Sequence, residues 1–354
     1  MTKQVRIALI GCGGMSQSHG HAIGEMPDAS ITAAVDIAAE ARERAAKTYG
    51  ATPYESTEAM LAAGVADAAV VVTRNPQHAE VTIPCLEAGI PVLCEKPMAT
   101  TWADCVHMVA AQGDPYPFLQ IGFELRTCPA FAPVNEIIAA GEIGEVRHVH
   151  FLQTPGSKGA DSWHVKKGIA GGLFFEKLCH QIDTFRMLLG ADVEQVVAIA
   201  ARNTFEHYEI PDNVYATFRF GEGKVAHISF IAGRAAVVEN HSAEEYMDKM
   251  HWLEYIIVGT KGSISLPLWR QELVVTKRDG DHTVLDRRIK LPGKGPEAAY
   301  HDTRQEMRMF VDAVRERRRS AFTADDSIRT MQAVFAAERS LAENGRAVKV
   351  TEII

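Results

Sequence analysis

The first 123 residues alternate between short apolar runs and helix-like stretches, and this alternation constrains the fold more than any other feature. The helix-like stretches include Ala38–Tyr49, His78–Ala88 and Trp102–Ala111. Runs that are apolar throughout are typical of strands buried on both faces, as in a parallel sheet. The pattern therefore predicts a doubly wound α/β (Rossmann) domain over residues 1–123. The apolar runs are Val5–Ile10, Ile31–Val35, Ala68–Val72, Pro91–Cys94 and Leu119–Phe123.

The pattern changes after Gly122. A predicted helix over Pro129–Ala140 is followed by runs that alternate apolar and polar residues, which favours a mostly antiparallel sheet with one open face. Residues 124–354 are thus expected to form an α+β domain for substrate binding and oligomerisation, ending in helices Asp302–Arg317 and Asp325–Glu343. Packing of the last helix, about 325–343, back on the first domain is left open. The alternating runs are Val146–Leu152, Val193–Ala198, Val214–Phe220, Val225–Phe230 and Leu253–Val258.

Composition excludes several classes of protein. A chain of 354 residues is too long for one ordinary core, and 47% hydrophobic with 23% charged residues is typical of globular proteins. The net charge of -8 argues against nucleic acid or anionic membranes as partners. No apolar run approaches the roughly 20 residues that span a bilayer, and the chain enters a strand without a secretory signal. Six cysteines without C-x-x-C spacing favour a reducing cytoplasm.

A glycine-rich loop links the first apolar run to a helix. It reads Gly11-Cys12-Gly13-Gly14-Met15-Ser16, so that Ser16 replaces the usual third glycine. Glycines here permit a tight turn and close approach to a pyrophosphate at a helix N-terminus, although a purely structural turn has the same pattern. Asp36 ends the second apolar run, where a carboxylate should bind ribose hydroxyls and repel a 2′-phosphate. The two features together predict NAD(H) in preference to NADP(H).

A second candidate site follows the third and fourth apolar runs. Thr73-Arg74-Asn75-Pro76-Gln77-His78 follows the third, and Glu95-Lys96-Pro97 follows the fourth. A lysine at the carboxyl end of a buried parallel strand points into the crevice where such sheets bind ligands. An isolated lysine is more often a solvated surface group, but this position favours one that polarises a substrate hydroxyl.

The segment Gly171–Asp183 predicts a helix with a polar face. At about 100° per residue, Leu178, Ile182, Phe185 and Leu189 form one stripe, while Glu176, His180 and Asp183 share the opposite face. A carboxylate beside His180 would orient the ring and raise its basicity, which suits removal of a hydroxyl proton. An ordinary amphipathic helix with a solvated polar face has the same pattern. No further ligands are spaced to complete a metal site, so no metal is expected.

These motifs resemble the Gfo/Idh/MocA family, the glucose-fructose oxidoreductase and inositol dehydrogenase group, over nearly the whole chain. The most specific match is Glu95-Lys96-Pro97. The other matches are Gly11–Ser16 with His19, Asn75 with His78, Gly122-Phe123 with Arg126, Gly171-Gly172 with His180 and Asp183, and the tail Ala336-Ala337-Glu338-Arg339 with Gly345-Arg346.

The resemblance implies that Lys96 contacts both nicotinamide and substrate, that the bond before Pro97 can be cis, and that His180 is the catalytic histidine. The family usually has aspartate at the position of Glu176, so the roles of Glu176 and Lys177 are open. Arg126, Trp163 and His164 are candidates for the substrate cleft, although each is more often structural. Packing is the favoured interpretation of His19. The expected cofactor-binding residues are Gly11, Gly13, Gly14, Met15, Ser16, Asp36, Thr73, Asn75, His78, Glu95 and Lys96.

The chain is therefore expected to oxidise a secondary alcohol of a sugar, inositol or polyol with NAD. Lys96 would polarise the hydroxyl and His180 would be the general base, oriented by Asp183 and by Glu176. One alternative is a redox-neutral lyase or glycosidase-type enzyme that returns the hydride, and another is a non-catalytic NAD-binding regulator. An apolar open sheet face would need a cover, which predicts a homodimer or homotetramer. The stretch Arg234–Trp252 fits a lid, a subunit contact or an ordinary connection.

Overall fold

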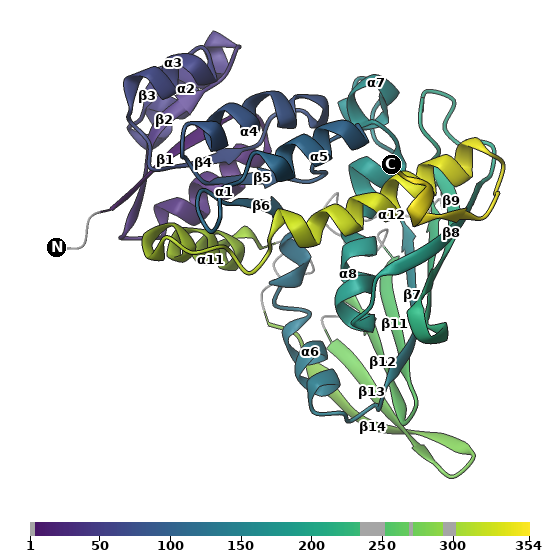
Figure 1. The fold of residues 1–354 in the computed structure, drawn as a ribbon. Helices are drawn as coiled ribbons and strands as arrows, with labels where there is room; N and C mark the ends of the chain where they lie inside the picture. Colours follow the sequence, from purple (N-terminus) through teal and green to yellow (C-terminus); the bar gives the residue numbers. More distant parts are fainter. Residues whose placement is uncertain (1–3, 234–251, 269–271, 293–301) are drawn as a thin grey trace, which may run out of the picture. The chain divides into compact units, whose positions relative to one another are not determined.

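The computed structural model describes residues 4–233, 252–268, 272–292 and 302–354, which form two compact units (Figure 1). The first unit comprises Met1–Glu124 and Thr303–Met331, and the second comprises Leu125–Asp302 and Gln332–Ile354. The stretch expected to be a lid, a contact or a connection lies outside the described residues, apart from its last position.

The first unit is built on a six-stranded sheet with the order β3-β2-β1-β4-β5-β6, in which every pairing is parallel. The predicted doubly wound sheet is thereby confirmed. The strand order changes direction between β1 and β4, and such sheets bind ligands outside the carboxyl ends of their strands. The strands are β1 (Val5–Ile10), β2 (Ala29–Val35), β3 (Thr52–Tyr54), β4 (Ala68–Val71), β5 (Val92–Glu95) and β6 (Leu119–Gly122).

A segment from late in the chain completes the first unit. The helix α11 (Thr303–Glu316) packs on α1, and its Met307 and Phe310 join Ile7 and Leu9 in one buried core. The sequence analysis assigned this segment to the second domain, but its apolar side is covered by the first sheet's core. The other helices of this unit are α1 (Met15–Gly24), α2 (Ala39–Tyr49), α3 (Thr57–Ala63), α4 (His78–Glu87) and α5 (Trp102–Ala110).

The second unit contains a nine-stranded sheet with the order β14-β13-β12-β11-β7-β10-β9-β8-β15. Its pairings are antiparallel except that of β7 with β10, so the predicted mostly antiparallel sheet is confirmed. The strands are β7 (Val146–Thr154), β8 (Val193–Ala200), β9 (Asn213–Phe220), β10 (Val225–Ile231), β11 (Trp252–Gly259), β12 (Gly262–Pro267), β13 (Glu272–Asp279), β14 (His282–Lys290) and β15 (Val348–Lys349).

Helices cover one face of this sheet. The helix α8 (Cys179–Leu189) packs on β7, and the rings of Phe174 and Phe185 meet Phe218 of β9 edge to face. Figure 1 shows α6 (Ala132–Ala139) and α8 on the same side of the strands. The described residues also form α7 (Lys167–Ala170) and α12 (Ala324–Ala342). The helix α12 belongs to the second unit from Gln332 onward. Within the described ranges, no helix is both long and apolar enough to cross a membrane.

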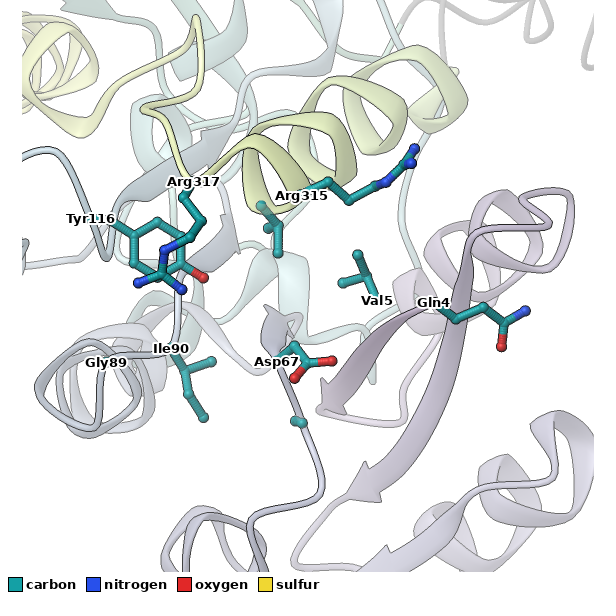
Figure 2. Close-up of a pocket in the computed structure, with 10 residues that line it drawn as sticks. Gln4, Val5, Asp67, Gly89, Ile90, Tyr116, Arg315 and Arg317 are labelled. Carbon is teal, nitrogen blue, oxygen red and sulfur yellow. The ribbon is translucent and has the colours of Figure 1, made fainter. Parts of the chain in front are cut away.

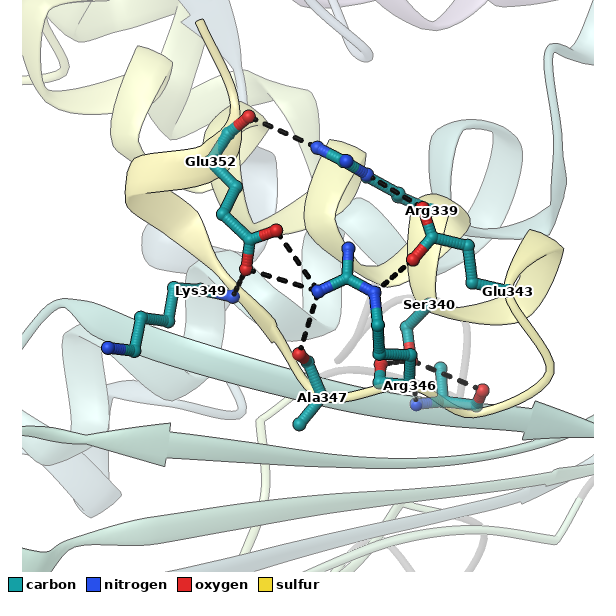
Figure 3. A network of polar contacts seen from close by, with 8 residues as sticks. Arg339, Ser340, Glu343, Arg346, Ala347, Lys349 and Glu352 are labelled. Carbon is teal, nitrogen blue, oxygen red and sulfur yellow. Dashed lines mark hydrogen bonds and ion pairs between the residues drawn. The ribbon is translucent and has the colours of Figure 1, made fainter.

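A polar network fastens the end of α12 to the second sheet (Figure 3). The buried Ser340 hydroxyl accepts the Ala198 N–H of β8 at 2.8 Å and donates to the Arg346 carbonyl at 2.7 Å. Arg346 also pairs with Glu343 and with Glu352. The Arg346 and Arg339 guanidiniums lower the pKa of Glu343 to about 2. Arg346 of the tail motif is therefore part of a network that stabilises the fold.

Candidate functional site

The glycine loop lies at the carboxyl end of β1. Gly11 has a φ of 92°, and a Cβ on it would lie 2.7 Å from the carbonyl carbon of Val72, so a side chain is excluded there. Gly13 and Gly14 are exposed and border open space, and α1 begins directly after them. The buried Ser16 hydroxyl donates to the Gly13 carbonyl at 2.5 Å. The loop thus leaves the N-terminus of α1 accessible, as a pyrophosphate requires.

Asp36 stands directly beside this loop. Its Oδ2 accepts the Cys12 N–H at 2.8 Å and its Oδ1 accepts the Ala38 N–H, also at 2.8 Å. The side chain is half-buried, so its remaining lone pairs can reach a ligand on the loop. The carboxylate therefore fixes the loop and provides negative charge next to it.

The segment after β4 is held by a buried histidine. His78 Nδ1 lies 2.7 Å from the Pro97 carbonyl, and Nε2 lies 3.2 Å from the Thr73 carbonyl. Burial lowers the pKa of His78, so the neutral ring has one N–H, which the shorter contact assigns to Nδ1. The hydrogen bond from Nδ1 to the Pro97 carbonyl joins the segment after β4 to the loop after β5. Asn75 is buried next to it at the start of a 3₁₀ turn, Asn75–Gln77.

Lys96 follows β5 and is anchored through its backbone. Its N–H donates to Glu95 Oε2 at 3.1 Å, and Glu95 Oε1 lies 2.7 Å from His19 Nε2 of α1. Burial alone would raise the pKa of Glu95, but the hydrogen bond from His19 and the charges of His19 and Lys96 hold it below its usual range. The Lys96–Pro97 bond is cis. Glu95 and His19 are buried, whereas the Lys96 side chain is half-buried.

These residues of the first unit fit a dinucleotide. Besides the loop and Asp36, the Thr73 hydroxyl at the carboxyl end of β4 is buried and has no hydrogen-bond partner among the described residues. A buried hydroxyl without a partner is costly, and a polar group of a ligand would satisfy it. The fit extends over three neighbouring strand ends, those of β1, β2 and β4.

The second unit brings the predicted polar side chains together in two groups. In the first group, Glu176 Oε1 lies 3.8 Å from His164 Nε2, and the His164 ring stacks on Trp163 with 4.0 Å between ring centroids. Glu176 lies in a π-helical stretch, Phe174–Leu178, and not in the α-helix that was expected. Because a π turn holds an extra residue, the regular 100° spacing between Glu176 and His180 was wrong.

Arg126 and Asp183 form the second group. Asp183 is buried, and its two oxygens accept hydrogen bonds from Arg126 Nε and Nη2, both at 2.6 Å. Such a bidentate, charge-assisted pair is strong and directional. The pair holds one face of α8 in place. The buried His180 lies on that face, one helical turn before Asp183. The polar face of this helix is therefore not the solvated face of an ordinary amphipathic helix.

Sequence reasoning did not assign two residues of this site. His19 was interpreted as packing, whereas it is the partner of Glu95. Glu338 was quoted only as part of the tail match, and its carboxylate contacts the helix that carries Glu176. The only sign in the sequence that these two positions matter was that both belong to motifs shared with the family. Among the described residues, no three His, Cys, Asp or Glu side chains could hold a metal ion.

A separate cavity of about 570 Å³ lies at the opposite edge of the first sheet (Figure 2). Its lining includes Val5, the first residue of β1, and Asp67, which directly precedes β4. Tyr116, Arg315 and Arg317 also line it. Arg317 lies over the Tyr116 ring, 4.3 Å from its centroid. The cofactor residues lie at the carboxyl ends of the strands, so this cavity is not the dinucleotide site.

Comparison with protein families agrees with this geometry. A model described as an oxidoreductase family with an NAD-binding Rossmann fold matches residues 5–115, and one for the C-terminal alpha/beta domain of the same family matches residues 135–350. The chain belongs to the Gfo/Idh/MocA family of oxidoreductases. The predicted resemblance to this oxidoreductase family and the NAD-binding Rossmann domain are confirmed.

Individual relatives are more distant. The inositol 2-dehydrogenase 2 of Saccharopolyspora erythraea is 30% identical over 208 residues, which span 56% of this chain and 58% of that protein. The myo-inositol 2-dehydrogenase of Thermotoga maritima is 25% identical over 99% of this chain and 100% of that protein. An Agrobacterium radiobacter oxidoreductase, solved with NAD⁺, L-tartaric acid and magnesium, has a TM-score of 0.82 and 21% identity, covering 99% of this chain and 100% of that one.

Proposed function

We propose that this chain oxidises a secondary alcohol of an inositol, sugar or related polyol. The observation that carries the proposal is Lys96, held by the buried Glu95–His19 pair at the carboxyl end of β5 in an NAD-binding unit. Two relatives support the substrate class. The one that matches 99% of the chain and the one that matches 56% of it are both named inositol 2-dehydrogenases.

Each side chain has a defined role in this proposal. Bound NAD⁺ would supply the acceptor for the hydride of the carbinol carbon. The Lys96 ammonium would donate a hydrogen bond to the substrate oxygen and stabilise the charge that develops on it. His180 would accept the hydroxyl proton as general base. Glu176 and His164 would contact the substrate, and the Arg126–Asp183 pair would hold the helix face from which His180 is presented.

A panel of inositols, sugars and related polyols, incubated with NAD⁺ and followed by NADH absorbance, tests the proposal. Formation of NADH with an equal amount of ketone supports it. Cleavage of a sugar bond without accumulation of NADH would instead assign the chain to redox-neutral enzymes that return the hydride. Binding of NAD⁺ without conversion of any compound would favour the non-catalytic regulator.

Two substitutions test the roles. Lys96→Ala and His180→Ala should each lower kcat by roughly 10²–10⁴, the usual contribution of general acid–base catalysis, and leave the affinity for NAD⁺ within a few-fold. Lys47→Ala and His282→Ala, at exposed positions, are the matched controls and should leave turnover unchanged. Survival of activity within about tenfold in either site variant would refute the mechanism.

We also infer that a second copy of the chain covers the open face of the second sheet. Direct strand pairing places Val197 and Ile256 in one row of that face, with Ile199 and Tyr215 beside them, and all four are exposed. Between Val197 and Ile256 this row holds Thr217, His227 and His150. Large apolar side chains exposed on an open sheet face are typical of a subunit contact. Ile199→Asp combined with Ile256→Asp should yield a smaller species in sedimentation, and an unchanged mass would refute the assignment.

A further inference from the structure

Two motifs that matched the family, Gly171-Gly172 and the tail around Glu338, meet within the second unit. The Glu338 carboxylate of α12 accepts the backbone N–H of Phe174 at 2.8 Å. A Cβ on Gly172 would lie 2.3 Å from Oε1 and 2.6 Å from Oε2 of the same carboxylate. The carboxylate can move away only by giving up its bond to Phe174. The hydrogen bond from Phe174 to Glu338 thus requires glycine at position 172.

This contact lies at the start of the helix that carries the site. The helix begins at Leu173, just after Gly171, whose φ of 84° reverses the chain. The first N–H groups of a helix have no partner within it, and a negative charge there also interacts favourably with the helix dipole. Here the acceptor for Phe174 comes from α12, a different element more than a hundred residues later in the chain.

We propose that Glu338 is a positioning residue: by capping this helix at Phe174, its carboxylate fixes where Glu176 and His180 are presented. The capping itself is independent of any activity, and its kinetic consequence rests on the proposed function. Glu338 touches no reacting group in this scheme. It acts through the helix, whose first residues are the π-helical stretch Phe174–Leu178 that carries Glu176.

The electrostatic surroundings of Glu338 support a charge that varies near neutral pH. Burial raises its pKa to about 7, while the hydrogen bond from Phe174 and the charge of Lys167 in α7 act in the opposite direction. A carboxylate accepts a stronger hydrogen bond than the neutral acid does. Ionisation thus strengthens the hydrogen bond itself, but burial makes the charge costly, so the folded segment is expected to lose stability as pH rises towards about 7.

A double-mutant cycle tests the contact and the positioning together. Glu338→Ala and Gly172→Ala should each speed amide hydrogen exchange in the segment 173–178 and lower kcat by up to about a hundredfold, with the affinity for NAD⁺ unchanged. In the Glu338→Ala background, Gly172→Ala should add little, because the space is vacated. Gly168→Ala is the matched control, since its Cβ would meet nothing within 4 Å.

Glu338→Gln keeps an acceptor for Phe174 and should restore most of the turnover. Its exchange in segment 173–178, corrected for the intrinsic rate, should not vary with pH, whereas that of the native chain should become faster as pH rises towards about 7. Independent, additive effects of the two alanine changes, or unaltered exchange, would overturn the proposal. If the native chain oxidises no alcohol, the proposed function fails, and the exchange results still decide whether Glu338 caps the helix.

Discussion

At the scale of single residues, Asp36 supports the glycine loop and is also the residue proposed to select the cofactor. The same carboxylate that should bind the ribose accepts the N–H groups of Cys12 and Ala38. Asparagine removes the charge and keeps one of the two acceptor oxygens, so only one of these N–H groups retains its acceptor.

Asp36→Asn should therefore keep part of the support of the loop and relax the discrimination between NAD and NADP. Asp36→Ala should in addition weaken NAD binding by about tenfold, equivalent to roughly 1.4 kcal/mol, because two backbone N–H groups lose their acceptor. Titration of both variants with both cofactors provides the measurement. An unchanged ratio of the two affinities in both variants would remove Asp36 from the basis of cofactor selectivity.

Glu338 predicts an unusual dependence of stability on pH. Its pKa rises from 4.5 to about 7 on folding, so the folded state binds the proton more tightly and loses stability as pH increases between these values. Glu338→Gln removes this loss and should be more stable than the native chain at pH 8 by at most about 3 kcal/mol. The difference should disappear near pH 4. Denaturant unfolding at several pH values measures it, and a constant difference would contradict the assigned pKa.

Residues differ in how far the sequence identifies them. The positions of Lys96 and Asp36 just after parallel strands could be predicted, because each follows an apolar run, and their roles stay predictions. His19 and Glu338 could not be assigned a role, because their importance comes from partners far away in the sequence. The Arg126–Asp183 pair was missed for the same reason, although both residues were candidates.

At the scale of elements, long periodic segments were predicted well and short irregular ones were not. The runs that became β1, β4 and β6 were located to within about one residue. The three-residue strand β3 contains a proline and was not predicted. The π-helical stretch was not predicted, because one extra residue in a turn does not change the hydrophobic pattern visibly.

The attachment of α12 to β8 yields an element-scale prediction. Ser340→Ala should lower the free energy of unfolding by about 1–3 kcal/mol, because the buried Ala198 N–H loses its acceptor. Urea unfolding is the measurement. Ser157→Ala, at an exposed position of the same unit, should have almost no effect. A Ser340→Ala variant as stable as the native chain would show that the bond contributes nothing.

At the scale of the whole molecule, the two units are not two consecutive pieces of chain. The first unit takes its core helix α11 from residues that follow most of the second unit. Phe310 of this helix is fully buried and meets Phe118 edge to face, with 5.6 Å between the ring centroids. The sequence pattern identified α11 as a helix, but periodicity does not show which core an apolar face will join.

Phe310→Ala should therefore destabilise the first unit by about 3–5 kcal/mol. Amide exchange should become faster in β1 and β4, which pack around this core, and should be unaffected in β9 and β10 of the second unit. Faster exchange in β9 and β10 instead would show that α11 stabilises the second unit. Leu285→Ala, at an exposed apolar position, is the control.

The late position of α11 has a consequence for synthesis on the ribosome. Chains emerge from the N-terminus, and an N-terminal domain usually completes its folding first. Here the apolar side of the first sheet stays uncovered until Thr303–Met331 has been translated. That segment follows nearly all of the second unit. The nascent chain must therefore carry an unfinished cofactor domain through most of its translation. We expect that interval to be the time when this chain depends most on chaperones.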